Sequence, residues 1–441
     1  MTAIVGILNR RGVAIAADSA VTRNRINEEK ITKNGNKMLR ISNTVPISVM
    51  ITGNGCFLGN PWDVVIRCYR RERGHISHPT VEACLHDLFD YISSNEQLWS
   101  STAIEHMITN VLDDIFWETE KSVGVNVDRH LKSRSYTLSR TFIHTFLKLL
   151  KKQCRAELAK GVCPQFDGYT IESFRAVIQP IFKVWIAGKT NSNKTRPPYP
   201  KEFLSEIKGS LEQMLFAKLT TRTEIVYNVD QIYSSTLVFT GYGTEQEYPS
   251  LVAVRVCGGF DNRVNYHIRK EDIVCISNEK PIAICPFAQT DISTAIISGL
   301  HKNSSINIST RLKRSLTHWD SVLFGDEDED ELDSELTALL SEIKIDDLQR
   351  KVCNAITRQQ KKNQQVWENQ LKNCDVKTMA ALAESMIDLT GFHRILTFQQ
   401  EGVGGPVDVA VITKNDGFTW LSRKSWYHHK DVNGQYGKLG I

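Results

Sequence analysis

The chain has 441 residues, of which 41% are hydrophobic and 24% are charged, as in ordinary globular proteins. Its 54 basic and 50 acidic side chains give a net charge of +4, a balance that argues against nucleic acid or an anionic membrane surface as a partner. No window approaches eighteen uninterrupted apolar residues, and the first residues lack the pattern of a signal peptide, so we expect neither a membrane span nor a secretory leader.

The 10 cysteines are scattered along the chain. None forms a CxxC pair or a Cys/His cluster with zinc spacing, and several lie in apolar runs where cysteine behaves as a small hydrophobe. We therefore expect a cytoplasmic protein with no structural metal and no cofactor.

The N-terminal part of the chain has the pattern of β structure. Short apolar runs predict strands at 2–8, 13–17, 38–41 and 45–52, with a turn at 10–12 between the first two. A glycine break follows at 53–55, and Pro61 begins a segment with the apolar spacing of a helix.

The middle and C-terminal parts change character twice. From about 73 to 231 apolar residues recur at helical spacing, as at 81–89 and 139–159, which predicts a mostly helical insertion. Strands are predicted again, followed by a helix, at 236–240, 251–257, 272–276, 282–285 and 291–300. Residues 301–375 are polar, with an acidic run at 326–333 that is typical of a solvated segment rather than a calcium loop. A helix at 379–389 and a hairpin at 406–412 and 417–421 precede a tail at 426–441.

The start of the chain carries the clearest chemical signal. Initiator methionine is efficiently removed before a small residue, which would leave Thr2 with a free α-amine. A threonine hydroxyl needs an adjacent base to act as a nucleophile, and an α-amine with a pKa of about 7.7–8.0 is close enough to neutrality to take its proton. Thr2 alone could therefore supply both the nucleophile and the base.

Several segments resemble proteasome β subunits and the bacterial HslV protease, which are N-terminal nucleophile hydrolases. Residues 2–7 and 12–19 resemble the opening of these proteins, in which an aspartate lies sixteen residues after the catalytic threonine, as Asp18 does after Thr2. The segment at 37–42, which begins with Lys37, the glycine turn at 51–55, the closing helix and residues 404–414 also match the family's pattern. The chain thus resembles a large, divergent, bacterial-type member of this family.

The resemblance implies an α+β fold, a four-layer αββα sandwich. Its proteasome-like core would comprise 2–72, 232–300 and 376–425. A helical insertion domain at 73–231 and a helical, acidic insertion at 301–375 would interrupt it, and 426–441 would be a C-terminal tail.

The resemblance also implies roles for four residues. Thr2 would attack the substrate carbonyl and form an acyl-enzyme that water hydrolyses. Lys37, buried beside it, would lower the pKa of the hydroxyl and the amine, and Asp18 would keep Lys37 charged and oriented. The Gly53 backbone N–H would stabilise the oxyanion.

Two supporting positions depart from the family. Tyr242 stands where the family often has a serine between two glycines, with Thr240 nearby. Gln400 and Val403 stand where an aspartate and a serine commonly precede the late glycine pair, with Glu401 adjacent to Gln400. Tyr242, Thr240, Gln400 and Glu401 are therefore candidate supporting residues.

These observations predict a threonine-type peptidase or amidase that acts on peptides or proteins and assembles with copies of itself. No phosphate-binding GxxxxGK[ST] loop is present, so we expect it to depend on a separate ATPase or adaptor. Two alternatives remain open: a weak or inactive proteasome-like scaffold, and an amidase acting on small molecules. Each candidate residue alone has a plainer structural interpretation, and Lys30 and Lys33 compete with Lys37. The glycines at 53, 55 and 59 are one residue too widely spaced for a dinucleotide-binding turn.

Overall fold

The structure is a computed structural model that describes residues 2–25, 28–32, 35–123, 140–191, 198–222, 234–288, 291–299, 308, 310–311, 345–397 and 403–424. It is a mixed α+β protein with antiparallel sheets, as expected. The chain divides into two compact units. The first comprises Met1–Met38, Gln246–Ser250 and Cys275–Ile441, and the second comprises Leu39–Glu245 and Leu251–Val274.

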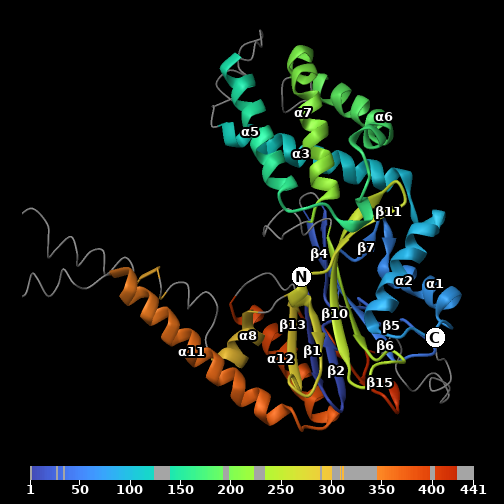
Figure 1. The fold of residues 1–441 in the computed structure, drawn as a ribbon, viewed down its shortest axis with the longest axis vertical. Helices are drawn as coiled ribbons and strands as arrows, with labels where there is room; N and C mark the ends of the chain where they lie inside the picture. The colour runs from blue at the N-terminus through green and yellow to red at the C-terminus, as the bar shows by residue number, and fades with distance from the viewer. Residues whose placement is uncertain are drawn as a thin grey trace, which may run out of the picture. The chain divides into compact units, whose positions relative to one another are not determined.

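The first unit contains a five-stranded antiparallel sheet, visible around β1 and β2 in Figure 1. Its order is β13 (Ile282–Ala288), β1 (Ala3–Asn9), β2 (Gly12–Ala17), β14 (Asp408–Thr413) and β15 (Gly417–Ser422). The strands expected at both ends of the chain are thereby confirmed. Because β1 pairs with β2 on one side and β13 on the other, the strand that follows Thr2 is an internal one.

Helix α12 (Val376–Leu396) covers one face of this sheet, and α8 (Asp291–Ser298) and α11 (Ile345–Leu371) lie with it (Figure 1). Alternate residues of β1, including Val5 and Ile7, belong to the same apolar cluster as Met386 of α12. Asn9 Nδ2 donates to the carbonyl oxygens of Leu371 and Cys374, which ties the end of β1 to the turn between α11 and α12. The intervening residues of β1 are buried as well, and so are all residues of β2, so both faces of these inner strands are shielded from water.

A hairpin occupies the polar stretch after Asp18. Its strands β3 (Val21–Arg25) and β4 (Glu28–Thr32) pair with each other and with no other strand of the described chain. The sequence pattern did not predict it, because these strands lack the alternating apolar residues that indicate a half-buried strand.

The second unit contains a larger antiparallel sheet, in the order β11 (Arg263–His267), β10 (Ser250–Phe260), β9 (Ser235–Gly241), β6 (Ile47–Gly53) and β5 (Met38–Arg40). β12 (Ile273–Cys275) also pairs with β10, and β7 (Cys56–Phe57) pairs with β8 (Asn60–Pro61). The strands predicted from the central apolar runs are confirmed, while β11 had not been predicted.

Helices make up much of the rest of this unit. They are α1 (Trp62–Arg73), α2 (Val81–Ser94), α3 (Ser101–Val123), α5 (Arg140–Leu158), α6 (Ile171–Thr190) and α7 (Lys201–Thr220), with the short 3-10 turns η1 (Glu96–Leu98), η2 (Pro164–Phe166) and η3 (Lys270–Asp272). The helices expected at 61, 81–89 and 139–159 correspond to α1, α2 and α5. No helix within the described chain is long and apolar enough to cross a membrane.

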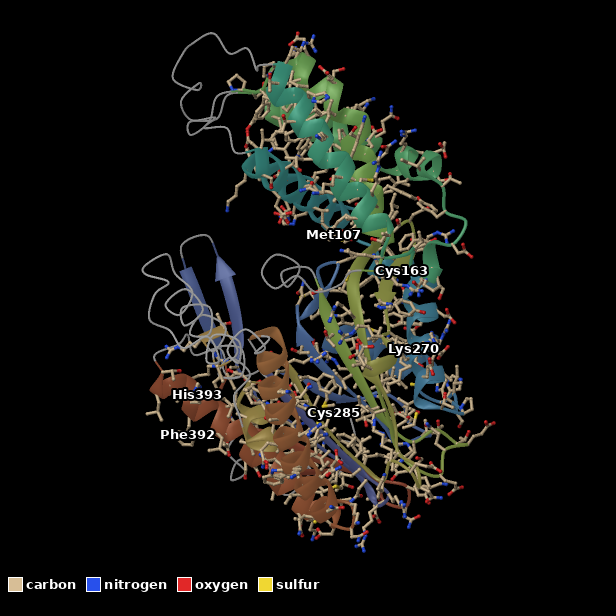
Figure 2. The ribbon with its side chains drawn as sticks, turned by 60° about the vertical axis from the view of Figure 1, so that its left-hand side comes forward. Met107, Cys163, Lys270, Cys285, Phe392 and His393 are labelled. Carbon is tan, nitrogen blue, oxygen red and sulfur yellow. The ribbon has the colours of Figure 1, made fainter. Side chains whose placement is uncertain are left out.

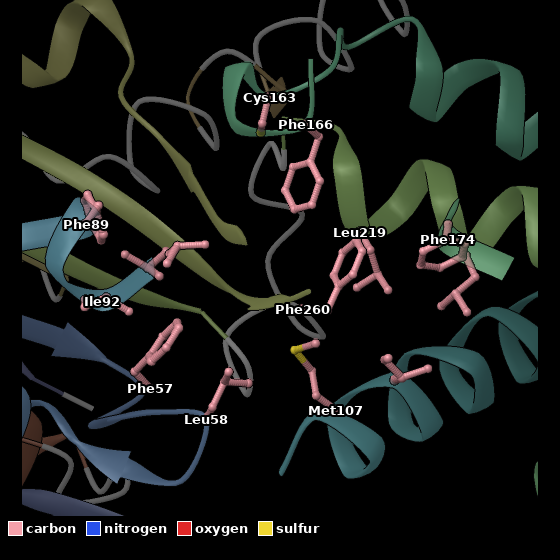
Figure 3. Close-up of a cluster of buried hydrophobic side chains, with 14 of the residues drawn as sticks. Phe57, Leu58, Phe89, Ile92, Met107, Cys163, Phe166, Phe174, Leu219 and Phe260 are labelled. Atoms are coloured by element: carbon pink, nitrogen blue, oxygen red, sulfur yellow. The ribbon is translucent and has the colours of Figure 1, made fainter. Parts of the chain in front are cut away.

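Aromatic side chains join these helices to the sheet of the same unit (Figure 3). The ring of Phe260, at the end of β10, stacks on Phe166 of η2 at 5.0 Å between centroids and meets Phe174 of α6 at 5.3 Å. Burying such rings is a large hydrophobic contribution. The helical segment and the sheet of the second unit therefore share one hydrophobic core. The acidic run at 326–333 and the tail at 426–441 lie outside the described residues.

Candidate active site

Thr2 immediately precedes the internal strand β1. The register of its neighbours is fixed on both sides, because Ala3 pairs with Ala288 and Ile4 pairs with Ala17. Thr2 is 8% exposed. A residue in this position is held by the sheet, as a nucleophile requires.

Asp18, which follows β2, is the centre of the polar contacts near Thr2. Its Oδ1 accepts hydrogen bonds from the Ala3 backbone N–H at 2.9 Å and from Lys37 Nζ at 2.7 Å. Its Oδ2 accepts from the backbone N–H groups of Ala20 and Gly404, each at 3.2 Å. The Asp18 N–H in turn donates to the Ala3 carbonyl oxygen at 3.1 Å. The carboxylate therefore links the residue after Thr2, the lysine and the late glycine pair.

Lys37, just before β5, forms an ion pair with Asp18 in which the two side chains are only 7% and 0% exposed. Burial lowers the pKa of Lys37 from its ordinary value, and the attraction of Asp18 opposes that shift. Charged groups at this depth are stable only when they are paired and hydrogen-bonded, as these are. Of the competing lysines, Lys33 lies outside the described residues, and the side chain of Lys30 is not described.

Several residues of this cluster were not singled out from the sequence. They are Ser19, whose hydroxyl donates to the Pro406 carbonyl, Gly404, and a second buried pair formed by Asp408 and Lys424. The sequence could have indicated Asp408, because it is a lone carboxylate within the apolar run 407–412. Nothing in the sequence indicated Lys424, because it lies in a polar segment after the last hairpin.

Three of the other expected residues belong to the second unit. Gly53 ends β6 with a φ of 80°, a conformation that favours glycine. Thr240 is buried in β9, opposite Ser48 of β6. Tyr242 is also buried; its N–H donates to the Pro46 carbonyl, and burial raises the pKa of its phenol to about 12.

The remaining expected positions precede the late glycine pair. Gln400 and Glu401 lie outside the described residues. Val403, which stands where the family commonly has a serine, is buried in the apolar core of the first unit. It therefore provides packing where a hydroxyl would provide a hydrogen bond.

Three of the cysteines are poor candidates for the nucleophile. Burial raises the pKa of Cys84, Cys163 and Cys285 to about 12, so these thiols are protonated at neutral pH and unreactive; Figure 2 shows Cys285 on β13. All of the cysteines are free. Within the described ranges, no group of three or more His, Cys, Asp or Glu side chains could hold a metal ion.

Comparison of the sequence with models of known protein families gives no match, and comparison with curated proteins gives none either.

Proposed function

We propose that this protein is a threonine-type hydrolase of peptide or amide bonds, with Thr2 as its nucleophile after removal of Met1. The observation that carries the proposal is the buried contact of Asp18 with both the Ala3 N–H and Lys37 Nζ, immediately beside Thr2 at the start of an internal strand. A buried carboxylate and ammonium with a perturbed lysine pKa, tied to the residue that follows Thr2, form the kind of cluster that is common at catalytic sites.

The proposed reaction proceeds through an acyl-enzyme. The Thr2 α-amine takes the proton of the Thr2 hydroxyl as Oγ1 bonds to the substrate carbonyl carbon. The C–N bond then breaks, and the leaving amine departs with that proton. Water adds to the resulting ester, giving one proton to the α-amine, and the ester C–O bond breaks to release the acid and restore the hydroxyl.

Lys37 and Asp18 support this chemistry in different ways. The Lys37 ammonium favours the alkoxide form of the hydroxyl and the neutral form of the amine, because a nearby positive charge lowers the pKa of both groups. Asp18 fixes Lys37 and the backbone next to Thr2 at the same time. Lys37 thus acts by its charge, whereas Asp18 acts by position.

The family resemblance extends the proposal in two directions. We assign stabilisation of the oxyanion to the Gly53 N–H, which suits a residue without a side chain. We also propose that the fold is the four-layer αββα sandwich, an arrangement in keeping with the burial of both faces of the inner strands β1, β2 and β6. A cytoplasmic homo-oligomer that works with a separate ATPase or adaptor belongs to the same proposal.

A second candidate, a weak or inactive scaffold, is favoured by one specific observation. Val403 is packed in an apolar core and carries no hydroxyl at the position where the family commonly has a serine. A proteasome-like subunit without this support would keep the fold and lose most of the rate.

Turnover of amide substrates by variants of Thr2 separates these candidates. Thr2→Ala should abolish hydrolysis of fluorogenic peptide amides, whereas Thr2→Ser should retain part of it because the hydroxyl and the amine remain. Thr419→Ala, an exposed threonine on β15, is the matched control and should leave the rate unchanged. Undiminished turnover in Thr2→Ala would eliminate Thr2 as the nucleophile. Turnover of small amides alone would identify the small-molecule amidase.

A further inference from the structure

A second buried ion pair lies beside the first one in the same unit. Lys424, just after β15, donates from Nζ to Oδ2 of Asp408, the first residue of β14, at 2.6 Å. The two side chains are 6% and 5% exposed. The Lys424 backbone N–H also donates to Asp408 Oδ1 at 2.9 Å, so both carboxylate oxygens are occupied by the same residue.

The Lys424 ammonium reaches two further acceptors. Nζ donates to the Gly35 carbonyl oxygen at 2.6 Å and to Ser19 Oγ at 3.1 Å. Gly35 and Ser19 also bond to each other, because the Gly35 N–H donates to the Ser19 carbonyl at 2.9 Å. An ammonium has three donors. The donors of Lys424 are therefore directed at one carboxylate and at the two chain segments that flank the hairpin β3–β4.

These two segments carry the proposed catalytic support. Ser19 follows Asp18 directly, and Gly35 lies two residues before Lys37. A rigid link between Ser19 and Gly35 therefore restricts the positions from which Lys37 can reach Asp18. Bonds to a charged donor are among the stronger hydrogen bonds of proteins, which suits them to this role.

We propose that Lys424, held by Asp408, is a positioning residue for the Asp18–Lys37 pair: it clamps Ser19 and Gly35 and adds a fixed positive charge close to Lys37. This inference rests on the proposed function for its catalytic consequence, but not for its effect on Lys37 itself.

The charges around Lys37 determine the sign of the effect. Burial lowers the pKa of Lys37, Asp18 and Asp408 raise it, and Lys424 lowers it further. Once Met1 is removed, the Thr2 α-amine is a further group beside this pair. Removing the charge of Lys424 should therefore raise the pKa of Lys37. If Lys37 works in its charged form, the alkaline limit of activity should move to higher pH with it.

The direct test is an NMR titration of the full-length protein labelled with ¹³C and ¹⁵N in its lysine side chains, in which the Lys37 signal is identified by its loss in Lys37→Arg. Lys424→Met should shift the Lys37 midpoint upward. Lys424→Arg, which keeps the charge and the donors, should restore the wild-type midpoint. Lys414→Met is the control, because this lysine follows β14 and pairs with Glu247 at the surface, and it should have no effect. An unchanged midpoint in Lys424→Met would overturn the inference.

A second variant covers the case in which Lys424→Met fails to fold because Asp408 is left unpaired. Asp408→Asn/Lys424→Met removes both buried charges, and we expect a smaller upward shift because the two charges act on Lys37 in opposite directions. A downward shift or none would contradict the inference.

The pH profile of amide hydrolysis separates this inference from the proposed function. If the Lys37 midpoint shifts as expected but wild-type protein hydrolyses no amide, the proposed function fails and the positioning role stands. If the wild type is active and its alkaline limit stays in place in Lys424→Met while Lys37 titrates as before, the positioning role alone fails.

Discussion

Replacing Asp18 by asparagine should destabilise the first unit far more than an ordinary surface change. The carboxylate accepts four hydrogen bonds at 2.7–3.2 Å and is almost fully buried. Asparagine has nearly the same shape, but it carries no charge, and its amide nitrogen donates where Asp18 Oδ2 accepts from Ala20 and Gly404. The variant therefore keeps the volume of the side chain and removes its electrostatic role.

The size of the expected loss of stability follows from the groups that Asp18→Asn leaves buried without a partner. Removing one member of a buried ion pair costs about 3–5 kcal/mol, because the Lys37 ammonium stays in place without its counter-charge. Each backbone N–H left unpaired costs about 1–3 kcal/mol, although these costs overlap with the first. We expect the free energy of unfolding to fall by about 3–5 kcal/mol.

Hydrogen exchange of the β1 and β2 amides is the assay, because it reports the stability of the unit that contains Asp18. The expected loss accelerates exchange through unfolding by roughly two to more than three powers of ten. Asp388→Asn, at an exposed position of α12 in the same unit, is the matched control and should change the free energy by less than about 0.5 kcal/mol.

A double variant tests the cause of the loss. Asp18→Asn/Lys37→Met removes both charges and should recover part of the stability, because no unpaired buried charge remains. The reasoning is refuted if Asp18→Asn is as mild as Asp388→Asn, or if the double variant is less stable than Asp18→Asn alone.

Three further predictions concern Gly53, Lys37 and Phe116. Gly53→Ala should lower the free energy of unfolding by about 1–3 kcal/mol in a denaturation experiment, because φ is +80° and the new Cβ would lie 2.6 Å from the Ser234 carbonyl oxygen. Gly55→Ala, with open space around the new Cβ, is the control and should be nearly neutral. The pKa of Lys37 is lower in the folded protein than its unfolded value of 10.5, so the unfolded chain binds more protons at pH values between these two pKa values. The free energy of unfolding of the wild type, relative to that of Lys37→Met, should therefore rise with pH in that window. A difference that does not change with pH would contradict the depressed pKa. Phe116→Ala should lower the free energy of unfolding of the second unit by about 3–5 kcal/mol, measured by urea denaturation, since Phe116 is fully buried among aromatic rings; a loss under 1 kcal/mol would contradict that packing.

The elements predicted best from the sequence are those whose apolar pattern is local. The strands β1, β2, β6 and β9 are short apolar runs bounded by turn residues, and the helices α1 and α2 have apolar residues at helical spacing. The hairpin β3–β4 has no such pattern, and within the described chain its strands pair only with each other. Its sequence therefore resembled a polar loop.

The candidate site could be predicted only in part, because its contacts join distant parts of the chain. The contact of Asp18 with Lys37 was expected from the family resemblance and not from any local pattern. Lys424 meets Ser19 across 405 residues of sequence, and nothing in the neighbourhood of Lys424 indicates that it is buried. Asp408 was the detectable member of this pair, as a carboxylate inside an apolar strand. A buried carboxylate of this kind implies a partner of opposite charge, but the sequence does not indicate which residue it is.

The central claim is that Thr2 with a free α-amine is the nucleophile, and labelling with a peptide epoxyketone tests it most directly. This reagent closes a ring onto both the hydroxyl and the free amine of an N-terminal threonine. Intact mass and peptide mapping of the purified protein should show loss of Met1 and one adduct, confined to Thr2. Retained Met1, or a processed Thr2 that remains unlabelled while amides are hydrolysed, would contradict the account.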